Sequence, residues 1–325
     1  MRAVGDHVTA AMAAAAVVVV VGSGCREKPT SRVLSSEQKE AARQADLDPV
    51  IEVALGGDIR MKMVLVPPGT FTMGSPPGEP GRGDDETQHE VSIPRPFYLA
   101  VHEVTQRQFA RFVRQTGYVT RAERDGWSYA WDGKTWGRRA KARWRTPGFP
   151  QRGADPVVCV SWNDAVAFCE WLSGKAGAEV RLPTEAEWEY ACRAGTTSAY
   201  FWGDDPDSGG ACCNGAGRDE GAVAAGTTFA WQDGHRHTAP VGSFESNAWG
   251  LYDMHGNVWE WCADWYRDDA AAPETGPIEG ALRVVRGGSW MYGPRQLRSA
   301  KRHASAPSNR TTGIGFRCAR TADAR

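Results

Sequence analysis

The sequence predicts a loop-rich α+β fold that is held together by aromatic packing. Among its 325 residues are 37 glycines and 14 tryptophans, and 41% of the residues are hydrophobic, enough to bury a globular core. Few helices are predicted, and the other segments are short and bounded by Gly, Pro, Asn and Asp, which are typical of turns. No internal repeat is present, which argues against solenoids and propellers.

Three helices are predicted, each from a capping residue followed by an apolar stripe. Thr105 caps the first helix, which ends at Gly117, and the second follows Ser161. Thr184 and Glu187 form a capping box at the start of the third, which Gly195 ends. The buried stripes are Phe109, Phe112 and Val113, then Ala165, Phe168, Cys169 and Leu172, then Trp188, Ala191 and Cys192.

Strand and loop signals account for much of the remaining chain. Residues 63–74 predict two short strands around a Pro-Gly turn, and residues 84–90 predict a polar loop. Residues 121–152 carry four tryptophans among basic residues without a clear period, so they predict a long loop. After the third helix, short strands and long loops continue to the end of the chain.

The first 25 residues predict an export signal. The apolar run at 9–21 is too short to cross a bilayer, and Gly22-Ser23-Gly24-Cys25 follows it. A small-residue stretch that ends in cysteine is typical of lipoprotein signals, in which the thiol is acylated after cleavage. We therefore expect a protein of the cell envelope that is lipid-anchored at Cys25, with secretion or a retained anchor as alternatives. Residues 26–55 predict a flexible tether, and 56–322 the folded domain.

Charge and cysteine content narrow the possible partners and bonds. A formal net charge of −1 indicates no nucleic-acid partner, and it indicates no membrane contact apart from the lipid anchor. Outside the cytosol, disulfides persist. Seven cysteines remain besides Cys25, so at least one is free, metal-bound or paired with another molecule. Adjacent Cys212 and Cys213 cannot easily bond to each other, because their Cβ vectors diverge.

Five segments in sequence order resemble the formylglycine-generating enzyme, or sulfatase-modifying factor, family. They are residues 156–165 (PVVCVSWNDA), 181–190 (RLPTEAEWEY), 256–261 (GNVWEW), 286–290 (RGGSW) and 315–318 (GFRC). The resemblance implies a variant of the C-type-lectin-like fold with bound calcium. It also implies the family's typical activity, the oxidation of a sulfatase cysteine to formylglycine by oxygen and a copper ion that two cysteines hold.

The chain departs from this family at the catalytic segment. Residues 290–299 contain no cysteine, and Tyr292 falls near the first catalytic position. Copper is therefore not expected, because soft Cu(I) requires thiolates. Arg298, Arg302 and their basic neighbours predict a groove for an anionic or peptide-carboxylate ligand, the alternative being a solvated basic face paired with acids. The candidate groove residues are Trp290, Tyr292, Arg295, Arg298 and Arg302, with Lys301 and Arg310 nearby.

The resemblance also implies structural calcium and one disulfide. The first calcium site corresponds to the side chains of Asp253 and Glu260 with the carbonyls of Gly256 and Val258, hard oxygen donors that calcium prefers. The implied disulfide joins Cys169 to Cys318. Cys192 corresponds to a second family disulfide whose partner position is Ser299, leaving Cys262 or a buried thiol as alternatives. A second calcium site corresponds to Asn214, Gly215, Asp233 and His235.

Two classes of function follow from these observations. The first is an envelope binding or assembly module, with a peptide or protein ligand, that retains the fold, calcium and disulfide without copper chemistry. The alternative is an oxidoreductase with different chemistry in the same groove, or a formylglycine-generating oxidase whose site is rearranged around Cys212 or Cys213. His102, His237 and His255 have no metal-ligand spacing, so no catalytic role is predicted for them.

Overall fold

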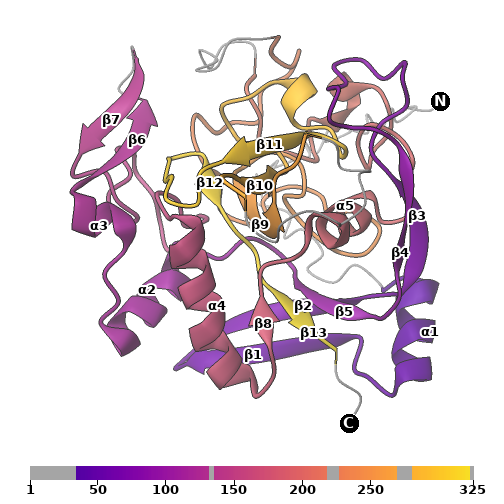
Figure 1. Ribbon diagram of the computed structural model, residues 1–325, viewed down its shortest axis with the longest axis horizontal. Helices are drawn as coiled ribbons and strands as arrows, with labels where there is room; N and C mark the ends of the chain where they lie inside the picture. The colour runs from indigo at the N-terminus through magenta and orange to yellow at the C-terminus, as the bar shows by residue number, and fades with distance from the viewer. Residues whose placement is uncertain (1–33, 132–134, 218–226, 269–279, 323–325) are drawn as a thin grey trace, which may run out of the picture. The chain divides into compact units, whose positions relative to one another are not determined.

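The structure, a computed structural model, describes residues 34–131, 135–217, 227–268 and 280–322 (Figure 1). All of these residues lie in one compact unit. Its larger sheet has the strand order β1-β2-β5-β13-β8, and its smaller sheet has the order β11-β10-β9-β12. The strands are β1 (Val50–Gly56), β2 (Ile59–Val66), β5 (Phe97–Ala100), β8 (Val180–Arg181), β9 (Trp259–Trp265), β10 (Arg283–Arg286), β11 (Arg302–Ser305), β12 (Ile314–Gly315) and β13 (Ala319–Thr321).

Two hairpins, five α-helices and two 3₁₀ helices, η1 (Pro206–Gly209) and η2 (Pro294–Gln296), complete the regular structure of the described residues. The hairpins are β3 (Gly69–Met73) with β4 (His89–Ile93), and β6 (Trp127–Trp131) with β7 (Trp136–Ala140). The α-helices are α1 (Ser36–Ala45), α2 (Gln106–Thr116), α3 (Arg121–Asp125), α4 (Trp162–Ala176) and α5 (Glu185–Arg193). None of the helices in these ranges has the length and apolar character needed to cross a membrane.

The three predicted helices are confirmed as α2, α4 and α5. Each starts with a capping box, in which Thr105, Ser161 or Thr184 accepts a hydrogen bond from the third helical residue. Gly117 ends α2 in the left-handed conformation with a φ of 70°. The end of α5 differs slightly from the prediction, because Ala194 rather than Gly195 takes the left-handed cap position.

The predicted tether at 26–55 is wrong for the part that the structure describes. Helix α1 and strand β1 lie within 34–56, and β1 pairs with β2 in the larger sheet. Gln38 is fully buried, and its amide donates hydrogen bonds to the carbonyls of Leu65 and Trp249. A polar composition suggested a tether, but one satisfied amide and two buried alanines, Ala41 and Ala42, attach the helix to the domain.

The predicted long loop at 121–152 is also wrong in part, because α3 and the hairpin β6–β7 fall within it. The strands pair from Trp127 opposite Ala140 to Trp131 opposite Trp136. Ser128 and Ala130 are buried while their neighbours are half-exposed, so β6 does alternate with period two. The partner strand β7 has no buried residue and carries two arginines, so the hairpin as a whole shows no clear period in the sequence.

Aromatic packing in the core is confirmed. The ring of Phe109 lies 5.4 Å from that of Phe112, 5.9 Å from that of Phe168 and 6.5 Å from that of Phe316. This cluster joins α2 and α4 to the larger sheet. A second buried cluster surrounds Trp188 on α5 and reaches β2, β5 and β10. Helix α5 is thereby fixed beside the smaller sheet, whose strands lead into the candidate site.

Candidate functional site

The segment expected to be catalytic, 290–299, lies against the smaller sheet. Trp290 is buried, and its indole N–H donates to the carbonyl of Thr312 at 3.1 Å. Tyr292 is half-buried, with its ring 5.9 Å from that of Trp259, and burial raises the pKa of its phenol. The side chains that line this position are therefore aromatic, and no thiol belongs to the segment.

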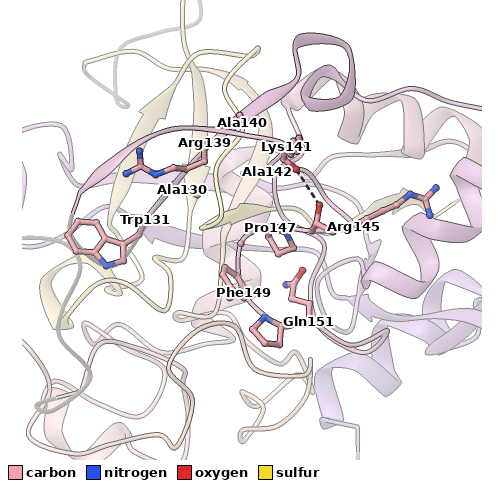
Figure 2. Close-up of a pocket in the computed structure, with 13 residues that line it drawn as sticks. Ala130, Trp131, Arg139, Ala140, Lys141, Ala142, Arg145, Pro147, Phe149 and Gln151 are labelled. Atoms are coloured by element: carbon pink, nitrogen blue, oxygen red, sulfur yellow. Dashed lines mark hydrogen bonds between the residues drawn. The ribbon is translucent and has the colours of Figure 1, made fainter.

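A pocket of about 710 Å³ adjoins Trp290. Phe149 links the two, because it lines the pocket and its ring lies 5.7 Å from that of Trp290. In Figure 2, Trp131 and Arg139 lie at one side of this pocket and Arg145 at the other. Together with Lys141, the two arginines give the pocket three cations and no carboxylate among its lining residues. The pocket therefore has a basic, partly aromatic wall.

The predicted ligand-binding role of Arg298 and Arg302 is wrong. Arg298 is 1% exposed and pairs with Glu79 at 2.6 Å and with Glu86 at 2.7 Å. Arg302 is also buried and pairs with Glu185 at 2.6 Å. Adjacent carboxylates raise the pKa of each guanidinium, although burial opposes this. The alternative of pairing with acids is the correct one, although these pairs are buried rather than on a solvated face.

Of the other basic residues near the predicted groove, Arg310 is also buried and paired, with Asp125 at 2.7 Å. Lys301 lies 3.8 Å from Glu86. Arg295 is exposed, and its side chain packs beside Gly81. A single exposed arginine does not form an anion-binding groove in this segment.

The residues of the first predicted calcium site lie in and beside β9. Glu260 accepts two hydrogen bonds of 2.6 Å from Arg317 and one of 2.8 Å from the indole of Trp188. Asp253 accepts the N–H of Gly242 at 2.7 Å through Oδ2, and its carboxyl group also lies within hydrogen-bond reach of the carboxyl group of Glu103. Glu260 is thus already neutralised by a cation, whereas Asp253 faces a second carboxyl group.

Sequence reasoning missed Glu103, which joins this cluster from the segment before α2. It is 1% exposed; its Oε1 accepts from Asn257 at 3.1 Å, and its carboxyl group lies within hydrogen-bond reach of that of Asp253. Burial, with Asp253 and Glu260 nearby, raises its pKa well above the usual range. Burial likewise raises the pKa of Asp253 to about 6. No motif marks Glu103, because its partners lie more than 100 residues away.

The structure also brings together the residues of the second predicted calcium site. Asp233 accepts the N–H of Gly215 at 2.9 Å and that of His235 at 2.7 Å. Asn214 donates to the carbonyl of His237 at 2.9 Å, and its buried Oδ1 has no hydrogen-bond partner among the described residues. Within those ranges, no group of three or more His, Cys, Asp and Glu side chains has a metal-binding arrangement. The fit to calcium therefore depends on the facing carboxyl groups of Glu103 and Asp253 at the first site, and on the unpaired amide oxygen of Asn214 at the second.

The seven cysteines of the domain are buried thiols in this structure. The sulfurs of Cys169 and Cys318 lie 3.7 Å apart, so the predicted pair is adjacent. Cys192 contacts the imidazole Nε2 of His255 at 3.5 Å and also interacts with Ser299, its predicted partner position. The thiol of Cys262 instead points to the carbonyl of Glu260. The alternative pairing of Cys192 with Cys262 therefore has no contact to support it.

His255 is a satisfied core histidine rather than a catalytic base. Its Nδ1 contacts the carbonyl of Leu297 at 2.5 Å, so Nδ1 carries the proton. Its Nε2 then accepts from the N–H of Phe201 at 3.3 Å and from Cys192. Burial lowers the pKa of His255 to about 3 and raises that of Cys192 to about 12. Both groups are neutral at pH 7, which gives neither an imidazolium nor a thiolate.

We expect His255 to make the fold acid-sensitive. The unfolded imidazole binds its proton near pH 6.5, whereas the folded one does not until about pH 3. Its contribution to stability is therefore complete above pH 6.5 and decreases as the pH falls, by about 2 to 3 kcal/mol between pH 6.5 and 4.5. Denaturant unfolding of His255→Gln over this range should show a fall that is smaller by that amount. If the free energy of unfolding of the variant falls as much between pH 6.5 and 4.5 as that of the unchanged protein, His255 is not the source of the acid sensitivity, whatever the variant's stability at pH 7.

Comparison with known proteins identifies the family of this chain. Residues 58–322 match the family model of the sulfatase-modifying factor enzyme 1-like domain. A formylglycine-generating enzyme of Streptomyces coelicolor is 40% identical over 80% of this chain and 89% of its own. The inactive C-alpha-formylglycine-generating enzyme 2 of Mus musculus is 34% identical over 80% and 86%.

The fold prediction is confirmed by solved structures. PvdO from Pseudomonas aeruginosa is 33% identical, with a TM-score of 0.66, over 85% of this chain and 99% of its own. The fold is accordingly α+β, the C-type-lectin-like variant found in formylglycine-generating enzymes. The five sequence segments, the fold and the match over 58–322 lead to one conclusion: this chain belongs to the sulfatase-modifying factor family, which includes the formylglycine-generating enzymes.

Proposed function

We propose that this chain is an exported binding or assembly module of the cell envelope that has lost the copper chemistry typical of its family. The observation that carries the proposal is the segment 290–299, which has no cysteine and in which the half-buried Tyr292 falls near the position that the resemblance gives to the first catalytic cysteine. A phenol whose pKa is raised by burial does not replace a thiolate as a ligand for Cu(I). An inactive relative of similar identity supports the same conclusion.

The pocket beside Trp290 is the proposed binding site, and its ligand is a peptide segment with an acidic group. Arg139, Lys141 and Arg145 supply positive charge, while Trp131 and Phe149 supply apolar contact area. Its volume of about 710 Å³ lies within the range of ligand sites in proteins. Aromatic and arginine side chains also dominate binding energy at protein interfaces.

Copper loading and a peptide assay together test the proposed loss of copper chemistry. The purified domain from residue 26 onward is loaded with Cu(I), and its copper content is measured by elemental analysis. It is then incubated under oxygen with a cysteine peptide of the sulfatase motif, and the peptide is analysed by mass spectrometry. We expect substoichiometric copper and unchanged peptide. Stoichiometric copper with aldehyde formation would establish an oxidase with a rearranged site.

Calcium is proposed as a structural ion at both predicted sites. Asp253, Glu103 and Glu260 place three buried carboxylates around the single guanidinium of Arg317, a charge excess that a divalent cation would offset. The unpaired oxygen of Asn214 supports the second site. At the first site, the carbonyls of Gly256 and Val258 would complete the oxygen ligands.

We expect calcium at 100 times its Kd to stabilise the domain by about 2.7 kcal/mol for each site that it occupies, since it binds only the folded state. Thermal unfolding with calcium and with excess EGTA measures this difference. Asn214→Ala should reduce the calcium-dependent shift, while Asn309→Ala, outside both sites, should preserve it. Identical unfolding curves with calcium and with EGTA would exclude structural calcium.

Export and lipidation at Cys25 are part of the proposal, although residues 1–33 lie outside the described residues. The sequence Gly22-Ser23-Gly24-Cys25 after an apolar run supports acylation of this thiol. Expression of the full chain in bacteria, followed by membrane fractionation, tests it. The protein should be found with the membranes, and Cys25→Ala should release it or block its maturation. Membrane association that is unchanged in Cys25→Ala would favour a retained anchor.

A further inference from the structure

A second pocket, of about 540 Å³, lies on the opposite side of the hairpin β6–β7. Strand pairing places Tyr129 opposite Arg138 and Ala130 opposite Gly137. Since alternate residues point to opposite faces, Tyr129 and Arg138 share one face, and Ala130 lies on the other. Tyr129 and Arg138 line the second pocket, and Ala130 lines the pocket beside Trp290. The two pockets share no lining residue, so they are distinct sites, and residues of the segment 306–311 line the second one.

The second pocket has more positive than negative charge. One carboxylate oxygen, Oδ2 of Asp125, accepts from Arg121 at 2.7 Å and from Arg310 at 2.7 Å. The exposed Arg138 stacks over Trp127 at 4.1 Å and has no carboxylate partner among the described residues. Three guanidinium groups thus line the pocket with a single carboxylate.

The pKa of Arg310 is lowered, whereas the pKa values of three other buried arginines are raised, which agrees with an excess of positive charge in the pocket. Arg298, Arg302 and Arg317 pair with carboxylates that raise their pKa values against the effect of burial. Arg310 is only 3% exposed, yet burial lowers its pKa, because Asp125 offsets burial incompletely and Arg121 adds repulsion. Its guanidinium donates to the carbonyls of Trp127 and Ser308 as well as to Asp125, so an anion in the pocket would act on it through its charge rather than through a free N–H.

Aromatic rings form the other wall of the pocket. Two guanidinium groups already lie over the ring of Trp127, those of Arg138 at 4.1 Å and Arg310 at 3.7 Å. Trp136, in contrast, is 41% exposed and is one of only three large hydrophobic side chains exposed in the described structure. An exposed indole beside a pocket is a typical binding surface, because it gains stability only when a ligand covers it.

We propose that this pocket binds an acidic carbohydrate. The carboxylate of a uronic acid accepts hydrogen bonds from Arg138, and the apolar face of the sugar ring packs on Trp136. Ser308, which lines the same pocket, has a hydroxyl that suits those of a sugar, whereas the side chains of Asn309 and Thr311 already form hydrogen bonds with neighbouring residues of the chain. This site extends the proposed function, and it does not depend on copper chemistry or on the pocket beside Trp290. An acidic peptide is the alternative that the test excludes.

The test is a calorimetric titration of the domain with a galacturonic acid trimer, and with a neutral galactose trimer as ligand control. We expect saturable binding of the acidic trimer only. Arg138→Gln should weaken it about tenfold or more, since a hydrogen bond to a charged group is lost. Trp136→Ala should weaken it as well. Arg114→Gln, a change at an exposed arginine of α2 that lines neither pocket, is the matched control and should change the Kd less than about twofold.

Arg138 is exposed and holds no structural ion pair in the described residues, so its replacement should leave folding intact. Far-ultraviolet circular dichroism of each variant checks this. Equal binding of both trimers, or binding that Arg114→Gln weakens as much as Arg138→Gln, would overturn the proposal. So would binding of an Asp-rich peptide but not of the acidic trimer, and so would the absence of saturable binding to that trimer.

Discussion

Replacing Arg317 with methionine should destabilise the domain by about 3 to 5 kcal/mol, since it leaves a buried charge without its partner. Arg317 is fully buried, pairs with Glu260 through two hydrogen bonds of 2.6 Å and donates to the carbonyl of Tyr252 at 2.9 Å. Without it, Glu260, Glu103 and Asp253 form a cluster of buried carboxylates with no cation. Chemical denaturation in excess EGTA measures the loss without a contribution from calcium.

Two controls separate the loss of charge pairing from the loss of a large side chain. The double variant Arg317→Met/Glu260→Gln should recover part of the stability, because it removes both charges together. Arg107→Met breaks an exposed pair with Asp58 and should cause no measurable change. If the double variant is no more stable than Arg317→Met alone, the effect comes from packing rather than from an unpaired Glu260.

The helices could be predicted because their signals are local. Thr105, Ser161 and Thr184 each cap a helix through a residue three positions away, so a short window contains the whole interaction. Helix α1 has the same signal, since Ser35 and Gln38 form a capping box. It was overlooked because its polar composition suggested a tether. Local capping chemistry was the better guide to structure in this segment.

The site could be predicted only where family motifs marked it. The residues expected around Asp253 and Asn214 do come together, because the residues of each site are close in sequence. The pairing of Arg298 could not be predicted, because Glu79 and Glu86 lie 219 and 212 residues away. Glu103 was missed for the same reason. Charge pairing between distant segments depends on the fold, so residue type alone did not distinguish a ligand-binding arginine from a structural one.

We expect Cys169 and Cys318 to form a disulfide in an oxidising compartment. Their sulfurs lie 3.7 Å apart, where α4 meets the start of β13, and both side chains are buried. The two residues are 149 positions apart in the sequence. A loop of this length corresponds to a stabilisation of about 4 to 5 kcal/mol, since the bond restricts the unfolded chain. Burial should also protect the bond from reducing agents in the folded state.

Thiol titration of the denatured domain from residue 26 onward, prepared without reductant, measures this bond. Of seven cysteines, two should be unreactive, which leaves five thiols. Reduction should restore all seven and lower the free energy of unfolding by the amount above, and Cys169→Ala should remove this dependence on reductant. Cys262→Ser, a change to another buried thiol, should keep it. Seven reactive thiols in protein isolated from the oxidising compartment would show that the pair stays reduced. Packing around Phe168 and Phe316, without a covalent bond, would then join α4 to the C-terminal strand.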